Sequence, residues 1–506
     1  MHFLPTYSPR FLPYLSLLTP IVFASLACNY VLSPFLPPTP TPTVPAIAAL
    51  PRQGDDLRPP TATPTPTPTN TPEPTPTATA IHPTPTINPA ALDDPDRPGL
   101  SGDTLVYGTE HFLIHYTFEG RDAVASADDN GNGFPDYVEA VSEAMELSWQ
   151  VEIVELGWAA PPSDKGIGGD TRYDIYLEDI FDDGTAGLTD GGYRDTTVGD
   201  NPNTPAIETN ASHSYISLDN DYREDSLLPP LDIMRVTAAH EFNHAIQFGY
   251  DSDEPANWLW EATATWMEDI VYDDINDQDY YLDAVFWSPH TCQVAEGKEG
   301  LDDGGHWYGM WIFLRYISEH YGNDAIRAIW ESLATQDGYA ALEMALTGVD
   351  ADLDEVFRGF SVALLTRAFE EGIGYPTVLL KGEIEAGRSF SPLIGIAQMA
   401  ADFIEIFGQG NVAITLQGLE HGLVVGLQDT EADIFRLQGG QISVDASQYE
   451  YLYLIVLNLS RAGRESDCQE VSYSILTGPG EQANLPDMTL NVPNFNPPRV
   501  KLLPDN

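Results

Sequence analysis

Residues 231–250 read LDIMRVTAAHEFNHAIQFGY, and the first 18 of them contain neither proline nor glycine. This composition predicts a helix. Its centre carries the motif HEFNH, residues 240–244. Because an α-helix has 3.6 residues per turn, His240 and His244 lie on one face and can bind the same metal ion. Glu241 lies about 100° further around the helix, within reach of a water molecule on that ion.

The chemistry that fits these three side chains is metal-assisted hydrolysis. The ion lowers the pKa of a water molecule, and the carboxylate of Glu241 accepts the proton. A zinc site of this kind needs a third protein ligand. Asp251 and Asp253 follow the motif and are two candidates, although the sequence around them carries no further metal-binding pattern.

A better-placed candidate is Glu261, in the segment WLWEATATWME, residues 258–268. It follows His244 by 17 residues, which leaves room for a turn and a return helix. On such a helix Glu261, Ala264 and Thr265 share one face, and the small neighbours leave space for a metal ion. The sequence therefore favours Glu261 as the third ligand.

Together the two motifs resemble those of the gluzincin clan of zinc metallopeptidases, which includes aminopeptidase N-like enzymes, bacterial collagenases and thermolysin-like enzymes. These enzymes share HExxH on one helix and a glutamate on the next. The resemblance covers about residues 235–269 and implies one zinc ion held by His240, His244 and Glu261. It also implies that Glu241 is the general base.

Residues near the two motifs exclude or disfavour some classes of zinc peptidase. Gln247 and Tyr250 stand where a metzincin has glycine and histidine, which excludes that class. Thr265 stands where thermolysin-like members have an acid that orients a histidine, so the resemblance names no partner for the zinc-binding histidines. The Gly-x-Met-Glu-Asn strand of aminopeptidase N-like enzymes is absent from the sequence, which disfavours an exopeptidase of that type.

Gluzincins also need a donor that stabilises the oxyanion formed during hydrolysis, usually a downstream tyrosine or histidine. The segment GGHWYGMW, residues 304–311, is expected to open a helix that runs to Tyr321. Tyr308 and His306 lie beside the apolar stripe of this helix, near its start. Tyr308 is the first candidate for this catalytic role and His306 the second, and a purely structural role for both stays open.

A second metal site is expected in DDNGNGFPDYVE, residues 128–139. Oxygen ligands fall at positions 1, 3, 5, 9 and 12 of this loop, glycine at position 6, and a backbone carbonyl at position 7, as in a calcium loop. A strand is expected before the loop and a helix after it, so the calcium ion would be structural. The expected ligands are Asp128, Asn130, Asn132, Phe134, Asp136 and Glu139.

The N-terminal residues predict export and a tether. Residues 1–27 fit a signal peptide, and Cys28 follows small residues as in the lipobox of bacterial lipoproteins, which implies lipidation. Ordinary secretion with cleavage after Ala27, or retention as a membrane anchor, are the alternatives. The segment 28–98 is rich in Pro-Thr repeats and would form an extended linker, on the order of 150–190 Å at full length. We expect a secreted protein at the cell surface.

Composition excludes several partners. The 506 residues include 22 Lys and Arg against 77 Asp and Glu, a formal net charge of -55. Such a chain repels nucleic acid and anionic membrane surfaces, so a lipid on Cys28 is the expected contact with a membrane. Three cysteines rule out a disulfide scaffold and a multi-cysteine zinc site. Whether Cys292 and Cys468 pair stays open.

The remaining pattern predicts an α+β chain. Strands are expected at 173–179 and 214–222, a loop or second cation site at 182–212, and mostly helix at 307–372. After about Ser391, short β-rich runs broken by Gly and Asn predict a β-sandwich. The expected domains are a gluzincin metallopeptidase domain at 99–385, with a mixed sheet whose edge strand binds substrate and a helical subdomain, and an all-β accessory domain at 390–506.

These expectations converge on a zinc metalloendopeptidase that is secreted and tethered to the cell surface. Its partner would be a protein or peptide substrate. Two alternatives remain: a peptidase-like surface adhesin without activity, and a zinc hydrolase that acts on a bond other than a peptide bond. Because His240, Glu241, His244 and Glu261 are all present, the sequence favours an active enzyme.

Overall fold

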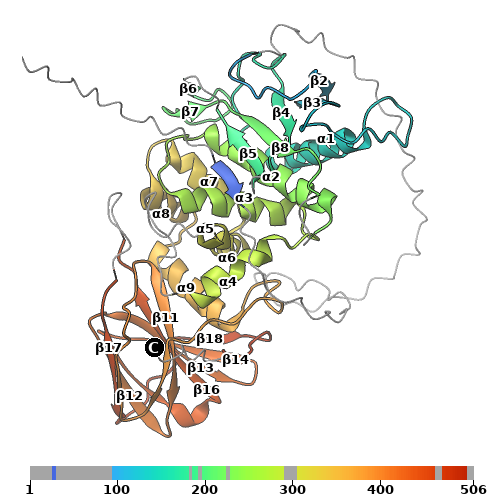
Figure 1. Cartoon of the computed structure of the whole chain (residues 1–506). Helices are drawn as coiled ribbons and strands as arrows, with labels where there is room; N and C mark the ends of the chain where they lie inside the picture. Colours follow the sequence, from blue (N-terminus) through green and yellow to red (C-terminus); the bar gives the residue numbers. More distant parts are fainter. Residues whose placement is uncertain are drawn as a thin grey trace, which may run out of the picture. The chain divides into compact units, whose positions relative to one another are not determined.

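The computed structural model describes most of the chain after the linker, all of it within one compact unit. A helical middle region has β-sheets on both sides, so the fold is mixed α+β (Figure 1). Most of the expected signal peptide and linker, and both Cys292 and Cys468, lie outside the described residues. The described residues are 26–29, 94–181, 185–191, 196–223, 228–289, 305–461 and 470–498.

The first sheet has six strands in the order β1-β5-β8-β4-β3-β2. Strands β3, β4 and β8 are parallel, whereas β5 runs antiparallel to β8 and β1 antiparallel to β5. The strands expected at 173–179 and 214–222 are confirmed as β4 and β8. The six strands are β1 (Leu26–Asn29), β2 (Leu105–Gly108), β3 (Phe112–Tyr116), β4 (Tyr173–Glu178), β5 (Thr185–Asp190) and β8 (Tyr215–Asp219).

Strand β5 contradicts the expectation of a loop across 182–212. Its sequence, TAGLTD, lacks the alternation of apolar and polar residues that predicts a half-buried strand. The segment is nevertheless a strand, because it pairs with β8. The short strands β6 (Thr197–Gly199) and β7 (Ala211–Ser212) also form a hairpin inside this stretch. The unexpected strand β5 matters for function, because it contacts helix α2 (Pro230–Phe248).

One face of this sheet is apolar and packs against α2 and α1 (Asp136–Trp149). Both helices bury apolar side chains in the same core as the sheet. Helix α1 continues into a π-helical turn, η2 (Gln150–Glu155). The buried side chains that the sheet contributes to this core are Phe112, Ile114, Tyr116, Ile175, Leu177, Ala186, Ile216 and Leu218.

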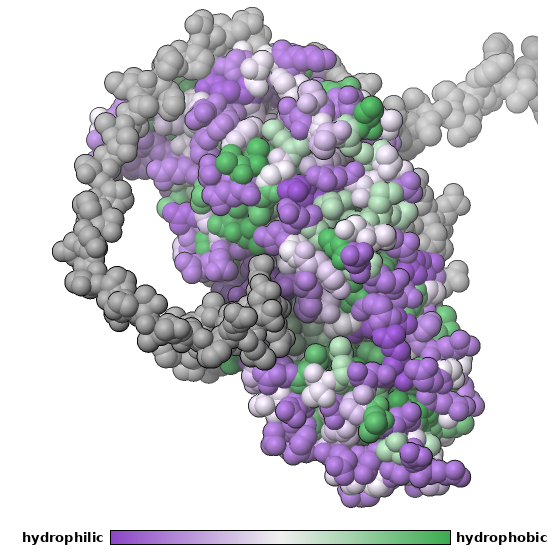
Figure 2. All heavy atoms as spheres, turned by 180° about the vertical axis from the view of Figure 1, so that it is seen from behind, coloured by the Kyte–Doolittle hydropathy of each residue, from purple (hydrophilic) through white to green (hydrophobic). Residues whose placement is uncertain are grey.

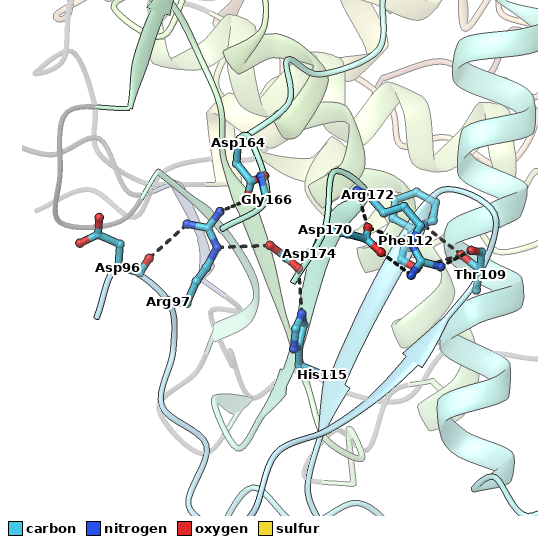
Figure 3. Close-up of polar contacts among 10 residues, drawn as sticks. All are labelled: Asp96, Arg97, Thr109, Phe112, His115, Asp164, Gly166, Asp170, Arg172 and Asp174. Carbon is cyan, nitrogen blue, oxygen red and sulfur yellow. Dashed lines mark hydrogen bonds and ion pairs between the residues drawn. The ribbon is translucent and has the colours of Figure 1, made fainter. Parts of the chain in front are cut away.

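The opposite face of the sheet holds a buried network of charges (Figure 3). Arg97, near the end of the segment 28–98 that was expected to be linker, pairs with Asp164 at 2.5 Å and with Asp174 at 3.4 Å. His115 of β3 lies 2.8 Å from the other oxygen of Asp174. Because the Arg97 side chain is almost fully buried, these pairs anchor the start of the folded region to β4.

The middle region is helical, as expected for 307–372. The helix expected from residue 304 to Tyr321 is interrupted at Met310, which makes it two helices. A Cβ atom at Gly309 would lie 2.6 Å from the carbonyl oxygen of Tyr281, so this glycine permits close packing on the 3-10 turn η4 (Gln278–Tyr281). The α-helices are α3 (Asn257–Val271), α4 (Leu282–Trp287), α5 (Gly305–Gly309), α6 (Trp311–Tyr321), α7 (Asn323–Leu333), α8 (Gly338–Gly348) and α9 (Leu353–Thr366).

The β-rich runs expected after Ser391 form two sheets, of orders β18-β14-β13-β16-β11-β9 and β10-β17-β12-β15. Ile404 and Leu454 of the larger sheet share a core with Ile414 of the smaller one, whereas Phe403, one residue earlier on β11, belongs to the core of the helices. The larger sheet is therefore buried on both faces. The strands are β9 (Gly382–Glu385), β10 (Ser389–Phe390), β11 (Ala400–Phe407), β12 (Asn411–Gln417), β13 (His421–Gln428), β14 (Glu431–Arg436), β15 (Gln441–Asp445), β16 (Tyr451–Asn458), β17 (Ser474–Pro479) and β18 (Met488–Asn491).

On the face seen in Figure 2, hydrophilic residues predominate and hydrophobic residues form scattered patches. Within the part of the chain that the structure describes, every helix is too short or too polar to cross a bilayer.

Candidate metal centre

Helices α2 and α3 bring the two histidines and Glu261 together. His240 and His244 project from one face of α2, and both are buried. Their Nε2 atoms lie 3.3 Å and 3.5 Å from Oε2 of Glu261, which projects from α3. The three ligand atoms form a buried group that could bind a metal ion.

The spacing of these atoms fits zinc. Two ligands at about 2.0–2.1 Å from a tetrahedral ion lie about 3.3 Å apart, which is close to the separations found here. Among the described residues, Nε2 of His244 and Oε2 of Glu261 are buried without a hydrogen-bond partner. Burial alone would raise the pKa of Glu261, but the two facing imidazoles lower that pKa to about 2. Glu261 therefore presents an ionised carboxylate at neutral pH.

The alternative aspartate ligands do not join this group. Asp251 instead lies beside Glu254 and Asp337, in a separate group of three acids. Asp253 belongs to neither group. The third potential ligand is thus Glu261, as the sequence favours.

The sequence left the partner of His240 unidentified, and the structure provides it. Nδ1 of His240 lies 2.5 Å from Oε1 of Glu268, a buried acid on α3. Burial raises the pKa of Glu268 to about 7, although the hydrogen bond with His240 opposes this rise. Glu268 follows Glu261 by seven residues, or two helical turns, and this spacing is the signal in the sequence that could have identified it.

His244 has a different partner. Its Nδ1 atom lies 2.7 Å from Oε1 of Gln247, one turn further along α2. The amide nitrogen of Gln247 donates to the backbone oxygen of Trp260 at 3.2 Å and to Oδ1 of Asn243 at 2.7 Å. These bonds turn the Gln247 oxygen towards His244. Because each Nδ1 atom faces an acceptor, each histidine carries its proton on Nδ1. Nε2 of each is then free to bind a metal ion, and it faces Glu261.

Strand β5 passes directly over Glu241, the expected general base. The hydroxyl of Thr189 donates to Glu241, 2.7 Å from Oε2 and 2.9 Å from the backbone oxygen. A Cβ atom at Gly187 would lie 2.6 Å from Cγ of Glu241, so only glycine allows the strand to approach this closely. Thr189 and Gly187 were missed from the sequence because their strand was expected to be a loop.

Both expected oxyanion donors are buried in α5. The ring of Tyr308 stacks on that of His240, with centroids 5.8 Å apart and an interplanar angle of 19°. It also stacks on Tyr281, at 4.8 Å. His306 lies on the same short helix and is 3 % exposed. Tyr308 is therefore in contact with a potential metal ligand.

The expected calcium loop, residues 128–139, is largely exposed and folds back on itself. Asp128 accepts a hydrogen bond from the backbone N–H of Asn132 at 3.1 Å. Glu139, in the first turn of α1, accepts from the side-chain amides of Asn130 and Asn132 at 2.8 Å and 2.6 Å. Four of the expected ligands are thus linked across one loop.

The two other expected calcium ligands lie at the end of this loop. Asp136 is the first residue of α1 and accepts a hydrogen bond from the backbone of Asp129 at 3.1 Å. The ring of Phe134, which would offer its carbonyl, packs edge-on against Tyr107 at 4.8 Å. The expected lipidation site, Cys28, lies in β1, whose backbone alone is described.

Comparison with known proteins gives no function. Residues 231–352, which include α2, α3 and all three potential ligands, match a family of unknown function (DUF6055). No curated protein matches the chain. A solved structure, described as a functionally unknown conserved protein from Bacillus anthracis str. Ames, is similar at 8% identity, 71% coverage of this chain, 73% of that chain and a TM-score of 0.26.

Proposed function

We propose that this protein is a zinc metalloendopeptidase. One observation carries the proposal: Nε2 of His240, Nε2 of His244 and Oε2 of Glu261 form a buried group at zinc spacing. Glu241 directly follows the first of these histidines on α2. Zinc, when bound, would lower the pKa of a water molecule and polarise a substrate carbonyl group. His240, His244 and Glu261 would hold it.

The chain's own residues would supply the rest of the chemistry. Glu241 would accept a proton from water and later pass it to the leaving amine. The hydrogen bond from Thr189 would keep its carboxylate in place. The hydroxyl of Tyr308 would donate to the oxyanion, a role supported by the position of its ring against His240.

The edge of β5 supports a peptide as substrate. An extended chain adds to an exposed strand through backbone hydrogen bonds, which recognise peptides with little regard to sequence. In the structure this edge pairs with an extended segment, β1, in antiparallel register with Leu26 opposite Thr189 (Figure 1). Since Thr189 contacts Glu241, a peptide bound along this edge would pass the general base.

The zinc assignment is tested by elemental analysis of the purified chain. Wild type should contain one zinc ion per chain, and His244→Ala should contain much less. His213→Ala, which removes a histidine outside the group, is the matched control and should keep the metal. Full zinc occupancy of His244→Ala would contradict the assignment.

We also propose that the loop at residues 128–139 binds calcium. The proposal is supported by the hydrogen bonds that gather Asp128, Asn130, Asn132 and Glu139, and by the positive φ of 93° at Gly133, which only glycine adopts readily. The ion would stabilise the start of α1. Its carboxylate and amide ligands suit calcium better than zinc.

Secretion and attachment to the cell surface complete the proposal. The signal peptide, residues 1–27, and lipidation of Cys28 would place the enzyme outside the cell, where calcium is abundant. The Pro/Thr-rich linker would hold the folded region away from the membrane. Mass spectrometry of the N-terminal peptide from the native host tests the lipid.

A further inference from the structure

A continuous chain of buried hydrogen bonds leads from His244 to an acid that the proposed chemistry does not use. His244 donates from Nδ1 to Gln247 at 2.7 Å, Gln247 donates to Asn243 at 2.7 Å, and Asn243 donates to Glu152 at 3.0 Å. All four side chains are 0 % exposed. Glu152 precedes Asn243 by 91 residues, so the fold alone brings them together.

All three bonds run in the same direction. Each amide accepts a hydrogen bond at its oxygen and donates one from its nitrogen, so the orientation of one amide determines the next. If Asn243 turned over, it would present its nitrogen to the nitrogen of Gln247. Gln247 donates from the same nitrogen to the backbone oxygen of Trp260 at 3.2 Å, so it would then either keep that bond and face the nitrogen of Asn243, or turn over and lose it. A Gln247 that turned over would present N–H groups to Nδ1 of His244. That imidazole would carry its proton on Nε2, the atom that has to bind the metal.

Glu152 ends this chain, and its surroundings explain why it faces Asn243. It lies in the π-helical turn η2, and such turns often mark functional positions because they alter which face a side chain occupies. Its second oxygen, Oε1, is buried with no hydrogen-bond partner among the described residues. Desolvation raises the pKa of Glu152 well above its usual value, and the hydrogen bond from Asn243 opposes this rise.

A purely structural role does not account for this residue. A buried acid with one unsatisfied oxygen is costly, and an apolar side chain of the same length would pack there at lower cost. This free-energy cost is explained if Oε2 of Glu152 is needed to accept the hydrogen bond from Asn243 and so to orient the two amides.

We propose that Glu152 is a positioning residue for the metal centre: it orients Asn243 and Gln247, which hold His244 with Nε2 free to bind zinc. This inference rests on the proposed function, since it concerns the affinity of the same site. The role is indirect, because Glu152 contacts neither the potential ligands nor the substrate edge of β5 in any described hydrogen bond.

The test is the zinc affinity of the full chain, measured by competition with a chromophoric chelator. Glu152→Met keeps the length of the side chain and removes the acceptor, and it should weaken zinc binding about 10–100-fold. Glu152→Gln keeps an acceptor oxygen and should restore affinity to within about threefold of wild type. Glu155→Met, an exposed acid in the same turn, is the matched control and should bind zinc like wild type.

A spectroscopic readout separates positioning from stability. In the cobalt-substituted protein, Glu152→Met should change the visible absorption bands, which report ligand geometry, whereas Glu155→Met should not. Wild-type zinc affinity and an unchanged cobalt spectrum in Glu152→Met would overturn the inference, even if its melting temperature fell. If Glu152→Met does not fold, Asn243→Leu breaks the same chain one step closer to His244 and must show the same loss of affinity.

The two proposals fail in different ways. A wild-type chain that binds no zinc contradicts the proposed function itself. A wild-type chain that binds zinc, together with Glu152→Met of equal affinity, contradicts only the role of Glu152.

Discussion

Nδ1 of His240 lies 2.5 Å from Oε1 of Glu268, two turns beyond Glu261 on the same helix. Helix α3 therefore provides both a potential metal ligand and the acceptor that orients another one. A histidine that donates from Nδ1 to a carboxylate keeps Nε2 deprotonated, and the carboxylate makes that nitrogen a stronger ligand. The candidate metal centre thus depends on two helices that both bury side chains in one core.

Removing this acceptor should weaken the site. Glu268→Leu leaves Nδ1 of His240 without its carboxylate, and we expect zinc affinity to fall about 10–100-fold. Glu268→Gln keeps an oxygen at the same place and should lose less. Competition with a chelator measures both variants, and wild-type affinity in Glu268→Leu would show that this contact does not support the metal.

The hydroxyl of Thr189 should matter for catalysis and not for metal binding. Thr189→Val keeps the shape and removes the hydrogen bond to Glu241; a bond to a charged group contributes about 1.5–3 kcal/mol. We expect kcat/KM to fall about tenfold to a hundredfold with full zinc content. Thr185→Val, in the same strand, is the control, and an equal loss in both variants would point to a general disturbance of β5.

Tyr308→Phe should lower kcat far more than it raises KM. One preorganised donor to an oxyanion is worth roughly a hundredfold to a thousandfold in rate. The ring would keep its stacking on His240 and Tyr281, so the melting temperature should change little. If stability falls without a kinetic change, Tyr308 is structural, and His306→Ala should then show the defect in kcat.

Calcium should stabilise the fold through the loop at residues 128–139. A ligand at a hundredfold excess over Kd adds about 2.7 kcal/mol to the free energy of unfolding. Melting curves with and without a chelator should differ for wild type and for Asp129→Ala, a neighbouring acid outside the expected ligand set. Asp128→Ala should lose this difference, and a calcium response equal to that of wild type would place the ion elsewhere.

The sequence predicted the local parts of the candidate site well. The spacing of His240 and His244 within one helix, and the position of Glu261 on the next, depend on helical periodicity that residue order reveals directly. Helices α2 and α3 are confirmed, and the structure brings Glu261 to the histidines. Glu268 lies two helical turns after Glu261, so the sequence shows that the two acids share a face of α3. Its contact with His240 depends on how α3 crosses α2, which the sequence does not show.

The parts that the sequence did not predict depend on contacts between distant segments. Strand β5 has no strand pattern of its own and forms because β8 offers it hydrogen bonds. Thr189 therefore could not be placed beside Glu241, 52 residues later. The sequence predicted a helix after the loop at residues 128–139 but not its change to a π-helical turn after Trp149, the turn that contains Glu152.

The central claim is that Glu241 activates water at a zinc site, and one paired measurement tests it most directly. Zinc content and hydrolysis of unfolded, dye-labelled casein are measured on the wild-type chain and on Glu241→Gln. We predict one zinc ion in both proteins, cleavage by wild type, and a rate about a hundredfold to ten-thousandfold lower in the variant, because glutamine cannot accept a proton from water. Casein cleavage by zinc-loaded Glu241→Gln at the wild-type rate would contradict the account.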